Sequence, residues 1–325
     1  MPDLSAFLSK HDPICPPGLL TKAQAGPPAR VAIAAAGAAL PMEAAKDAAD
    51  AGILVPVFTG VADDIRRQAD RLNWDISAYQ IEEAAGEAAS AAAAASICGA
   101  GDADVLMKGH LHSDAFMKAA LSRDAGLRTG NRLVHIFHIS PPDGGPGVLI
   151  SDAAVNVAPD LRTRKTAVDE VISLLALLGT STPRIAFLSA TESAIPSVPS
   201  SLEAAELRDW ARDTYPQAQV SGPLAFDGIF SSEAAAIKGM ADDPVTGQAD
   251  AVIVPDIVSG NAIFKALVYL SGGCAAGVVT GAKVPILLTS RADPPAARLA
   301  SVALAAILNA GTQGDPARPR PDPGE

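Results

Sequence analysis

Short apolar runs alternate along the chain with segments whose apolar residues recur at helical spacing. Strand-length runs lie at residues 31–35, 53–58, 75–81, 103–107, 134–139, 148–150, 184–189, 251–254 and 284–288. Between them the pattern predicts helices at 41–50, 61–72, 84–97, 160–178, 202–215, 260–269 and 296–308. This alternation predicts an α/β protein with parallel strands and helices on both sheet faces.

A dense Pro/Gly cluster at residues 141–147 interrupts the alternation, which restarts directly afterwards. Such a cluster is typical of a turn, a hinge or a domain boundary. A length of 325 residues favours two domains. Residues 311–325 are Pro-rich and polar, which predicts a disordered tail.

Polar residues follow several of the predicted strands at once. After the strand at 103–107 come Lys108, His112 and Ser113, with Arg128 and Arg132 beyond the next helix. In open α/β sheets ligands bind at the carboxyl ends of the strands, so these residues form either an anion pocket or two solvated loops. Further polar clusters follow later strands, at residues 151–152, 255–256 and 290–291. If the strands are parallel, these clusters lie along one rim, and two facing rims would enclose a cleft.

Composition narrows the class of function. The formal net charge is −11 and the pI about 4.9, which argues against a nucleic-acid or membrane-surface binder. Three separated cysteines form no disulfide framework or zinc motif, which fits a reducing cytoplasm. We expect no signal peptide and no membrane span, because no apolar run approaches the roughly 20 residues that a span needs.

Several common motifs are absent from the sequence. It contains no Walker A loop, no complete dinucleotide fingerprint and no G-x-S-x-G nucleophile elbow. His110 and His112 lie two residues apart, but no second cluster of ligands accompanies them. We therefore predict no metal site.

The polar clusters, taken in order, resemble blocks of the phosphate acetyl/butyryltransferase family. The resemblance spans roughly residues 30–308 and is carried by segments 103–132, 151–156, 222–227, 251–265 and 290–293. It implies two three-layer α/β lobes with a cleft between them, like isocitrate/isopropylmalate dehydrogenase, the first lobe being completed by the C-terminal segment. The implied domains are residues 1–145 with 285–325, and residues 146–284.

The resemblance also implies a reaction, acyl-CoA + phosphate ⇌ acyl phosphate + CoA, on acetyl-CoA or butyryl-CoA. Coenzyme A is then a substrate, no bound organic cofactor is needed, and the enzyme is a homodimer whose partners are small molecules. Ser290 and Arg291 would contact the acyl phosphate, with Arg291 stabilising negative charge. The implied substrate-binding residues are Lys108, Ser113, Arg128, Arg132, Asp152, Asn156, Asp256, Asn261 and Lys265.

One position departs from the acetyl branch of the family, which carries a catalytic Asp seven residues after the motif serine. This chain has Ala297 there, and the nearest carboxylate is Asp293, in the S-R-A-D arrangement typical of the butyryl-like branch. We predict Asp293 as the general base for the CoA thiol, with His112 as the second candidate. The small residues Ala153, Ala154 and Gly260 favour room for a longer acyl chain.

Two alternative functions stay open at this point. A metal- and NAD-dependent dehydrogenase has the same two-lobe architecture but needs a group of metal-binding aspartates or histidines. A non-catalytic protein that binds CoA or acyl phosphate needs no general base. Phosphate- or arsenate-dependent thiol release from acyl-CoA distinguishes the three.

Overall fold

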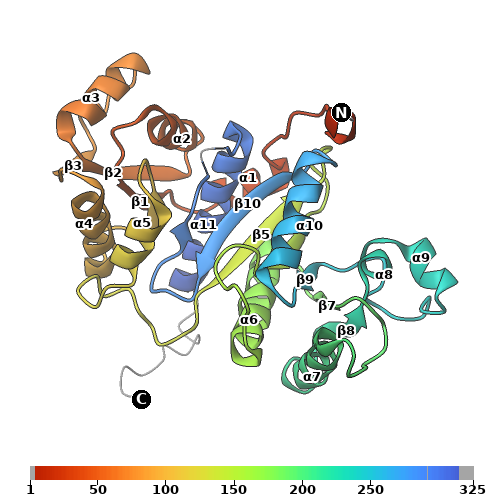
Figure 1. Cartoon of the computed structure of the whole chain (residues 1–325). Coiled ribbons are helices and arrows are strands. Elements are labelled where there is room, and N and C mark those ends of the chain that lie inside the picture. Colours follow the sequence, from red (N-terminus) through yellow and green to blue (C-terminus); the bar gives the residue numbers. More distant parts are fainter. Residues whose placement is uncertain (1–3, 291, 315–325) are drawn as a thin grey trace. The chain divides into compact units, whose positions relative to one another are not determined.

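A computed structural model describes residues 4–290 and 292–314 of the chain. They belong to two compact units, each made of two stretches of sequence. The central unit contains Arg132–Ala275 and Met1–Asp12, and the flanking unit contains Pro13–Asn131 and Ala276–Glu325. Figure 1 shows the helices and strands, coloured along the sequence.

In the flanking unit most strands run parallel. Their order is β3-β2-β1-β4-β11-β10, and only the β10–β11 pair is antiparallel. The strands are β1 (Ala29–Ala34), β2 (Leu54–Gly60), β3 (Gln80–Glu83), β4 (Val105–Lys108), β10 (Cys274–Thr280) and β11 (Ile286–Leu287). The helices are α1 (Pro17–Gln24), α2 (Ala39–Asp50), α3 (Ala62–Arg71), α4 (Glu87–Ala100), α5 (Ser113–Ala120) and α11 (Pro295–Gly314).

The alanine-rich helix α4 packs closely against its surroundings. Ala91, Ala94 and Ala95 are buried, and a Cβ added at Gly99 would lie 1.8 Å from the carbonyl oxygen of Ala125. Small side chains let the helix backbone approach its neighbours, and the helix predicted at 84–97 is confirmed.

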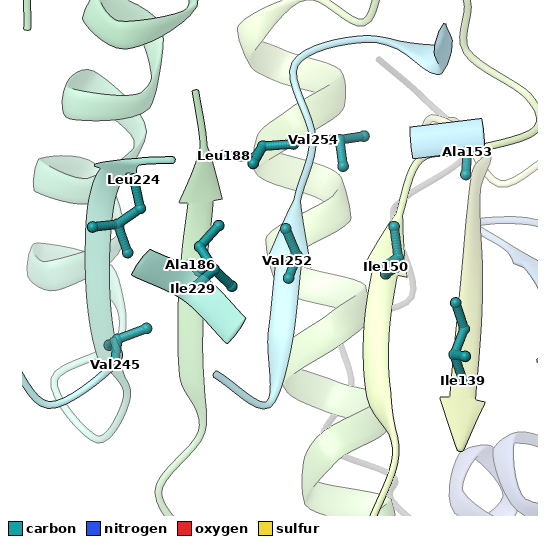
Figure 2. Close-up of a cluster of buried hydrophobic side chains, with 10 residues drawn as sticks. All are labelled: Ile139, Ile150, Ala153, Ala186, Leu188, Leu224, Ile229, Val245, Val252 and Val254. Atoms are coloured by element: carbon teal, nitrogen blue, oxygen red, sulfur yellow. The ribbon is translucent and has the colours of Figure 1, made fainter. Parts of the chain in front are cut away.

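The central unit has its own strands, in the order β5-β6-β9-β7-β8. These are β5 (Val134–Ser140), β6 (Val148–Ser151), β7 (Arg184–Leu188), β8 (Gln219–Leu224) and β9 (Ala251–Ile253). The helical segments are η1 (Leu4–Phe7), α6 (Leu161–Leu178), α7 (Pro199–Thr214), α8 (Phe226–Phe230), α9 (Ser232–Ile237) and α10 (Ile257–Tyr269). Figure 2 shows aliphatic side chains from these strands, from α8 and from the connecting segments in one buried cluster, with Ile150 and Val252 on neighbouring strands.

The Pro/Gly cluster at residues 141–147 is the turn of a hairpin. β5 and β6 pair antiparallel, with Ile136 opposite Ser151. A connection this short cannot make a parallel crossover, which takes a dozen or more residues. The hairpin keeps residues 134–145 in the central unit, whereas the predicted boundary placed them with the N-terminal segment. Residues 276–284 group with the flanking unit, whereas they were predicted in the second domain.

Some elements were not predicted from the sequence. The pattern predicts neither strand β10, which is rich in Gly and Ala, nor helix α1, which follows a proline pair. Pro17 occupies the first turn of α1, where its missing N–H costs nothing. The strand expected at 75–81 begins only at Gln80. Helix α11 continues to Gly314, so a tail starting at 311 is wrong, and 315–325 lie outside the described residues.

No helix within residues 4–290 and 292–314 has the length and apolar character that crossing a membrane requires.

Candidate active site

The ends of β1 and β4 form the base of the site in the flanking unit. Lys108 pairs with Ala34 in register, and the amide of Gly109 donates to the Ala34 carbonyl oxygen at 2.9 Å. A Cβ at Gly109 would lie 2.2 Å from that oxygen, so only glycine fits there. This close approach fixes the direction in which the chain leaves β4 and places Lys108 and His110 at the carboxyl edge.

A small pocket lies at this edge. Thr289, which follows β11, donates through its hydroxyl to the Lys108 carbonyl oxygen at 3.1 Å. The pocket is lined by Leu40, Pro41, Ala44, Met107, Lys108, Gly109, His110, Thr289, Ser290 and Arg298. Lys108 is buried there, so a cation forms part of the pocket wall.

Ser290 and Asp293 form a hydrogen-bonded turn beside this pocket. The Ser290 amide donates to Asp293 Oδ2 at 2.7 Å, and the Asp293 amide donates to the Ser290 carbonyl oxygen at 3.2 Å. Burial raises the pKa of the Asp293 carboxyl, while the Ser290 amide and the cations Arg298 and Lys108 lower it, with a net increase. A carboxylate with a raised pKa is a better proton acceptor. Arg291, the predicted anion ligand in this segment, lies outside the described residues.

Arg298 is a site residue that the sequence analysis did not select. It lies on α11, is buried, and donates from Nη1 to the Asp293 carbonyl oxygen at 2.7 Å. Its neighbour Ala297 is also buried, so a methyl group occupies the position of the acetyl-branch aspartate. The signal in the sequence was an arginine inside an otherwise apolar helix directly after the S-R-A-D segment.

His112 and Ser113 lie together at the start of α5. The His112 amide and Nδ1 are 3.0 and 2.9 Å from Glu87 Oε2. Hydrogen bonds from His112 lower the pKa of the Glu87 carboxyl. The His112 side chain is 77% exposed, and it is not among the residues that line the Lys108 pocket. This arrangement orients a solvated imidazole, and Ser113 beside it is exposed as well.

The two predicted loop arginines differ in their surroundings. Arg128 is exposed and its backbone forms an isolated bridge with Ala282, in the flanking unit. Arg132 belongs to the central unit, is 52% exposed and lies 3.8 Å from Asp160. Asp160 caps α6 by accepting from the Thr163 amide at 2.8 Å. Both arginines leave their guanidinium groups open to solvent.

In the central unit, each carboxylate oxygen of Asp152 accepts two hydrogen bonds. Its Oδ1 accepts from the amides of Ala154 and Val155, each at 2.9 Å. Its Oδ2 accepts from the His135 amide at 3.0 Å and from Asn156 Nδ2 at 2.7 Å. The buried carboxylate thus organises the 151–156 turn and offers little capacity to a ligand.

The remaining predicted residues surround the start of α10. Asp256 caps this helix by accepting from the Ser259 amide at 2.8 Å. Asn261 Nδ2 donates to the Ala153 carbonyl oxygen at 3.3 Å, and Lys265 is exposed one turn further on. A Cβ at Gly260 would lie 2.9 Å from the Asp152 carbonyl oxygen. The backbone therefore fills the space beside Gly260, so this glycine does not add room for a longer acyl chain.

Each unit thus gathers its own part of the predicted set. Lys108, Ser290 and Asp293 come together in the flanking unit, with Arg298 added. In the central unit, Asp152 bonds to Asn156, while Asn261 bonds to the adjacent Ala153. In the part of the chain that the structure describes, no group of three or more His, Cys, Asp or Glu side chains is placed to hold a metal ion.

Comparison with known proteins identifies the class to which this fold and site belong. A phosphate acetyltransferase of Rhizobium meliloti is 38% identical over 293 residues, which cover 90% of this chain and 92% of that protein. A phosphate butyryltransferase of Clostridium acetobutylicum is 31% identical over 86% of this chain and 93% of that protein. The crystal structure of a branched-chain phosphotransacylase from Enterococcus faecalis matches with a TM-score of 0.76 and 29% identity, covering 87% of this chain and 99% of that one.

Residues 83–306 also match the family described as phosphate acetyl/butaryl transferase. The chain belongs to this family, so the resemblance inferred from its sequence is confirmed. The predicted α/β fold class and the assignment as an acyltransferase enzyme are confirmed with it.

Proposed function

We propose that this chain is a phosphate acyltransferase that interconverts acyl-CoA plus phosphate with acyl phosphate plus CoA. The observation that carries the proposal is the turn between Ser290 and Asp293, where a half-buried carboxylate with a raised pKa lies beside the buried cations Lys108 and Arg298. Proton transfer from a thiol and binding of phosphate need these two kinds of group.

Asp293 acts as the general base in the direction of acyl-CoA formation. A free thiol has a pKa of about 8.5, so at neutral pH CoA must lose a proton to become a nucleophile. Asp293 takes that proton, the sulfur attacks the carbonyl carbon of the acyl phosphate, and phosphate leaves from the tetrahedral intermediate. In the other direction phosphate attacks the thioester, the C–S bond breaks, and protonated Asp293 returns the proton to the sulfur. No covalent enzyme intermediate is needed.

Charge that develops on the carbonyl oxygen needs a donor or a cation. By the family resemblance we assign this role to Arg291, with Ser290 as the neighbouring contact to the acyl phosphate. Lys108 neutralises phosphate oxygens from the pocket wall.

The exposed residues are assigned to CoA. Arg128, Arg132 and Lys265 present mobile positive charge to solvent, which suits the phosphates of CoA. His112 and Ser113 at the start of α5 bind the substrate there, and the Glu87 carboxylate keeps the His112 ring in place. Asp152, Asn156, Asp256 and Asn261 act by holding the loops that carry these contacts.

The substrate set includes short acyl chains, acetyl or butyryl. The S-R-A-D segment favours the butyryl-like branch, whereas the relatives include enzymes named for either acyl group. We further propose a homodimer in the cytoplasm that needs no organic cofactor; the buried thiol of Cys98 fits a reducing compartment.

The decisive assay is phosphate- or arsenate-dependent release of free thiol from acetyl-, propionyl- and butyryl-CoA. We expect release with at least one of them, and the order of kcat/KM values gives the preferred chain length. Absence of release from all three would refute the proposal. Thiol-independent NAD reduction that EDTA abolishes would identify a dehydrogenase, and CoA binding without turnover would identify a binding protein.

A further inference from the structure

Arg298 has a donor that no described residue satisfies. Its side chain is 7% exposed, and Nη1 is used by the Asp293 carbonyl oxygen. Nη2 lies 3.8 Å from Glu43 Oε2, beyond hydrogen-bond distance, and Glu43 is 42% exposed. Nε has no partner among residues 4–290 and 292–314. A buried guanidinium with an unused donor calls for a further acceptor, such as a ligand oxygen.

The pocket around Arg298 favours an anion for two more reasons. Lys108 is a second buried cation in its wall, and Ser290 adds a hydroxyl at its edge. Leu40 and Pro41 bring the N-terminus of α2 to the pocket. That 12-residue helix has no acidic residue in its first turn and no side-chain cap, so the positive end of its dipole is not neutralised locally.

We propose that the pocket lined by Lys108, Ser290 and Arg298 is the subsite for the phosphoryl group, and that Arg298 binds a phosphate oxygen with its guanidinium group. The inference rests on the proposed function and adds a substrate-binding residue to it. The enclosed space is small, so it admits the oxygens of one phosphoryl group rather than an acyl chain or a nucleotide. Through Nη1 the same guanidinium holds the backbone at Asp293, which places the phosphate next to the proton acceptor.

This assignment gives the first turns of α11 a role different from that in the acetyl branch. Ala297 supplies no carboxylate there, and the adjacent Arg298 supplies a cation. The carboxylate comes instead from Asp293 in the preceding turn. Two carboxylates balance the positive charge of Lys108 and Arg298. Glu43 lies near the Arg298 guanidinium, and Asp293 interacts electrostatically with both Arg298 and Lys108.

The test separates phosphate binding from acyl-CoA binding. For Arg298→Gln we expect the KM for phosphate to rise about 10- to 100-fold, as the loss of a charge-assisted hydrogen bond predicts, with the KM for acyl-CoA changed less than about twofold. Arg298→Lys should restore part of the affinity for phosphate, because lysine keeps the positive charge but lacks the planar set of N–H donors of the guanidinium. The matched control is Arg30→Gln, which removes a guanidinium paired with Asp104 at the amino end of β1 and should leave both KM values unchanged.

A second readout does not depend on turnover. Inorganic phosphate should raise the thermal midpoint of the wild type and of Arg30→Gln, and raise that of Arg298→Gln much less. Equal protection of all three, or KM values for phosphate and acyl-CoA that rise together, would overturn the assignment. If Arg298→Gln does not fold, the same two comparisons are made with Arg298→Lys. If the wild type releases no thiol, the proposed function is refuted. The effect of phosphate on the thermal midpoints would then still show whether this pocket binds phosphate.

Discussion

Asp293 in the flanking unit and Asp152 in the central unit both follow the end of a strand, yet their environments differ. Asp152 accepts four hydrogen bonds, three from backbone amides and one from Asn156. Among residues 4–290 and 292–314, Asp293 accepts one, from the Ser290 amide, and burial raises its pKa. A carboxylate whose acceptor sites are all used holds a loop together, whereas one with spare capacity can take a proton from a substrate. We therefore assign Asp152 to structure and Asp293 to catalysis.

Replacing the catalytic carboxylate should give the largest effect. Asp293→Asn keeps the size of the side chain but removes the base, so kcat should fall by about 10²- to 10⁴-fold. The thermal midpoint should move little, because the turn keeps the hydrogen bond between the Asp293 amide and the Ser290 carbonyl oxygen. Steady-state thiol release together with thermal unfolding measures both. An unchanged kcat would exclude Asp293 as the base and direct attention to His112.

Replacing the structural carboxylate should act on stability. Asp152→Ala leaves the buried His135 amide and the partly buried Ala154 and Val155 amides without their acceptor, and a fully buried donor left unpaired costs about 1–3 kcal/mol. We expect the free energy of unfolding in urea to fall by several kcal/mol. Asp152→Asn is the matched control, since it keeps one acceptor oxygen and should lose less. A variant as stable as the wild type would contradict the structural assignment.

Two buried histidines on β5 should make stability depend on pH. Burial lowers the pKa of His135 and of His138 to about 4, below the ordinary value of 6.5. Between these values the unfolded chain binds protons that the folded chain does not, so stability is present above pH 6.5 and is lost as the pH falls toward 4. The loss reaches about 3 kcal/mol per histidine. Urea unfolding at several pH values measures it, and His135→Leu should reduce the slope; a flat profile in the wild type would contradict the burial argument.

The smallest effect is expected at the exposed pair that orients His112. Glu87→Gln weakens the contact to Nδ1, and ion pairs exposed to solvent contribute little. The KM for CoA should rise at most about fivefold, with kcat within twofold. The control Asp63→Asn removes another exposed carboxylate, one that pairs with Arg66 on α3, and should change neither constant. A large fall in kcat for Glu87→Gln would instead favour His112 as the base.

The sequence was sufficient for the elements whose pattern is local. The apolar run before Lys108, the glycine after it and the helical spacing beyond Ser113 predicted β4, its loop and α5 correctly. Strand β10 was missed because a Gly- and Ala-rich segment has a weak strand signal. The antiparallel β5–β6 pair was missed because strand direction depends on the turn between the strands, not on the strands themselves.

The site was harder to predict because its parts meet only in three dimensions. Arg298 is far from Lys108 in the sequence, and only the packing of α11 beside β11 and β4 places both on one pocket. Asp152 and Asp293 look alike as polar residues after apolar runs, and their different roles follow from hydrogen bonds that depend on backbone geometry. The spacing of residues along the sequence does not predict these hydrogen bonds.

The most direct test of the contrast between the two aspartates is the pH dependence of kcat/KM for acyl-CoA formation from acyl phosphate and CoA. The account predicts an acidic limb in the wild type whose apparent pKa lies above the ordinary aspartate value of 3.8, in line with the raised pKa of Asp293. The limb should persist in Asp152→Asn and disappear, together with most of the activity, in Asp293→Asn. An acidic limb that survives unchanged in Asp293→Asn would contradict the assignment of Asp293 as the general base.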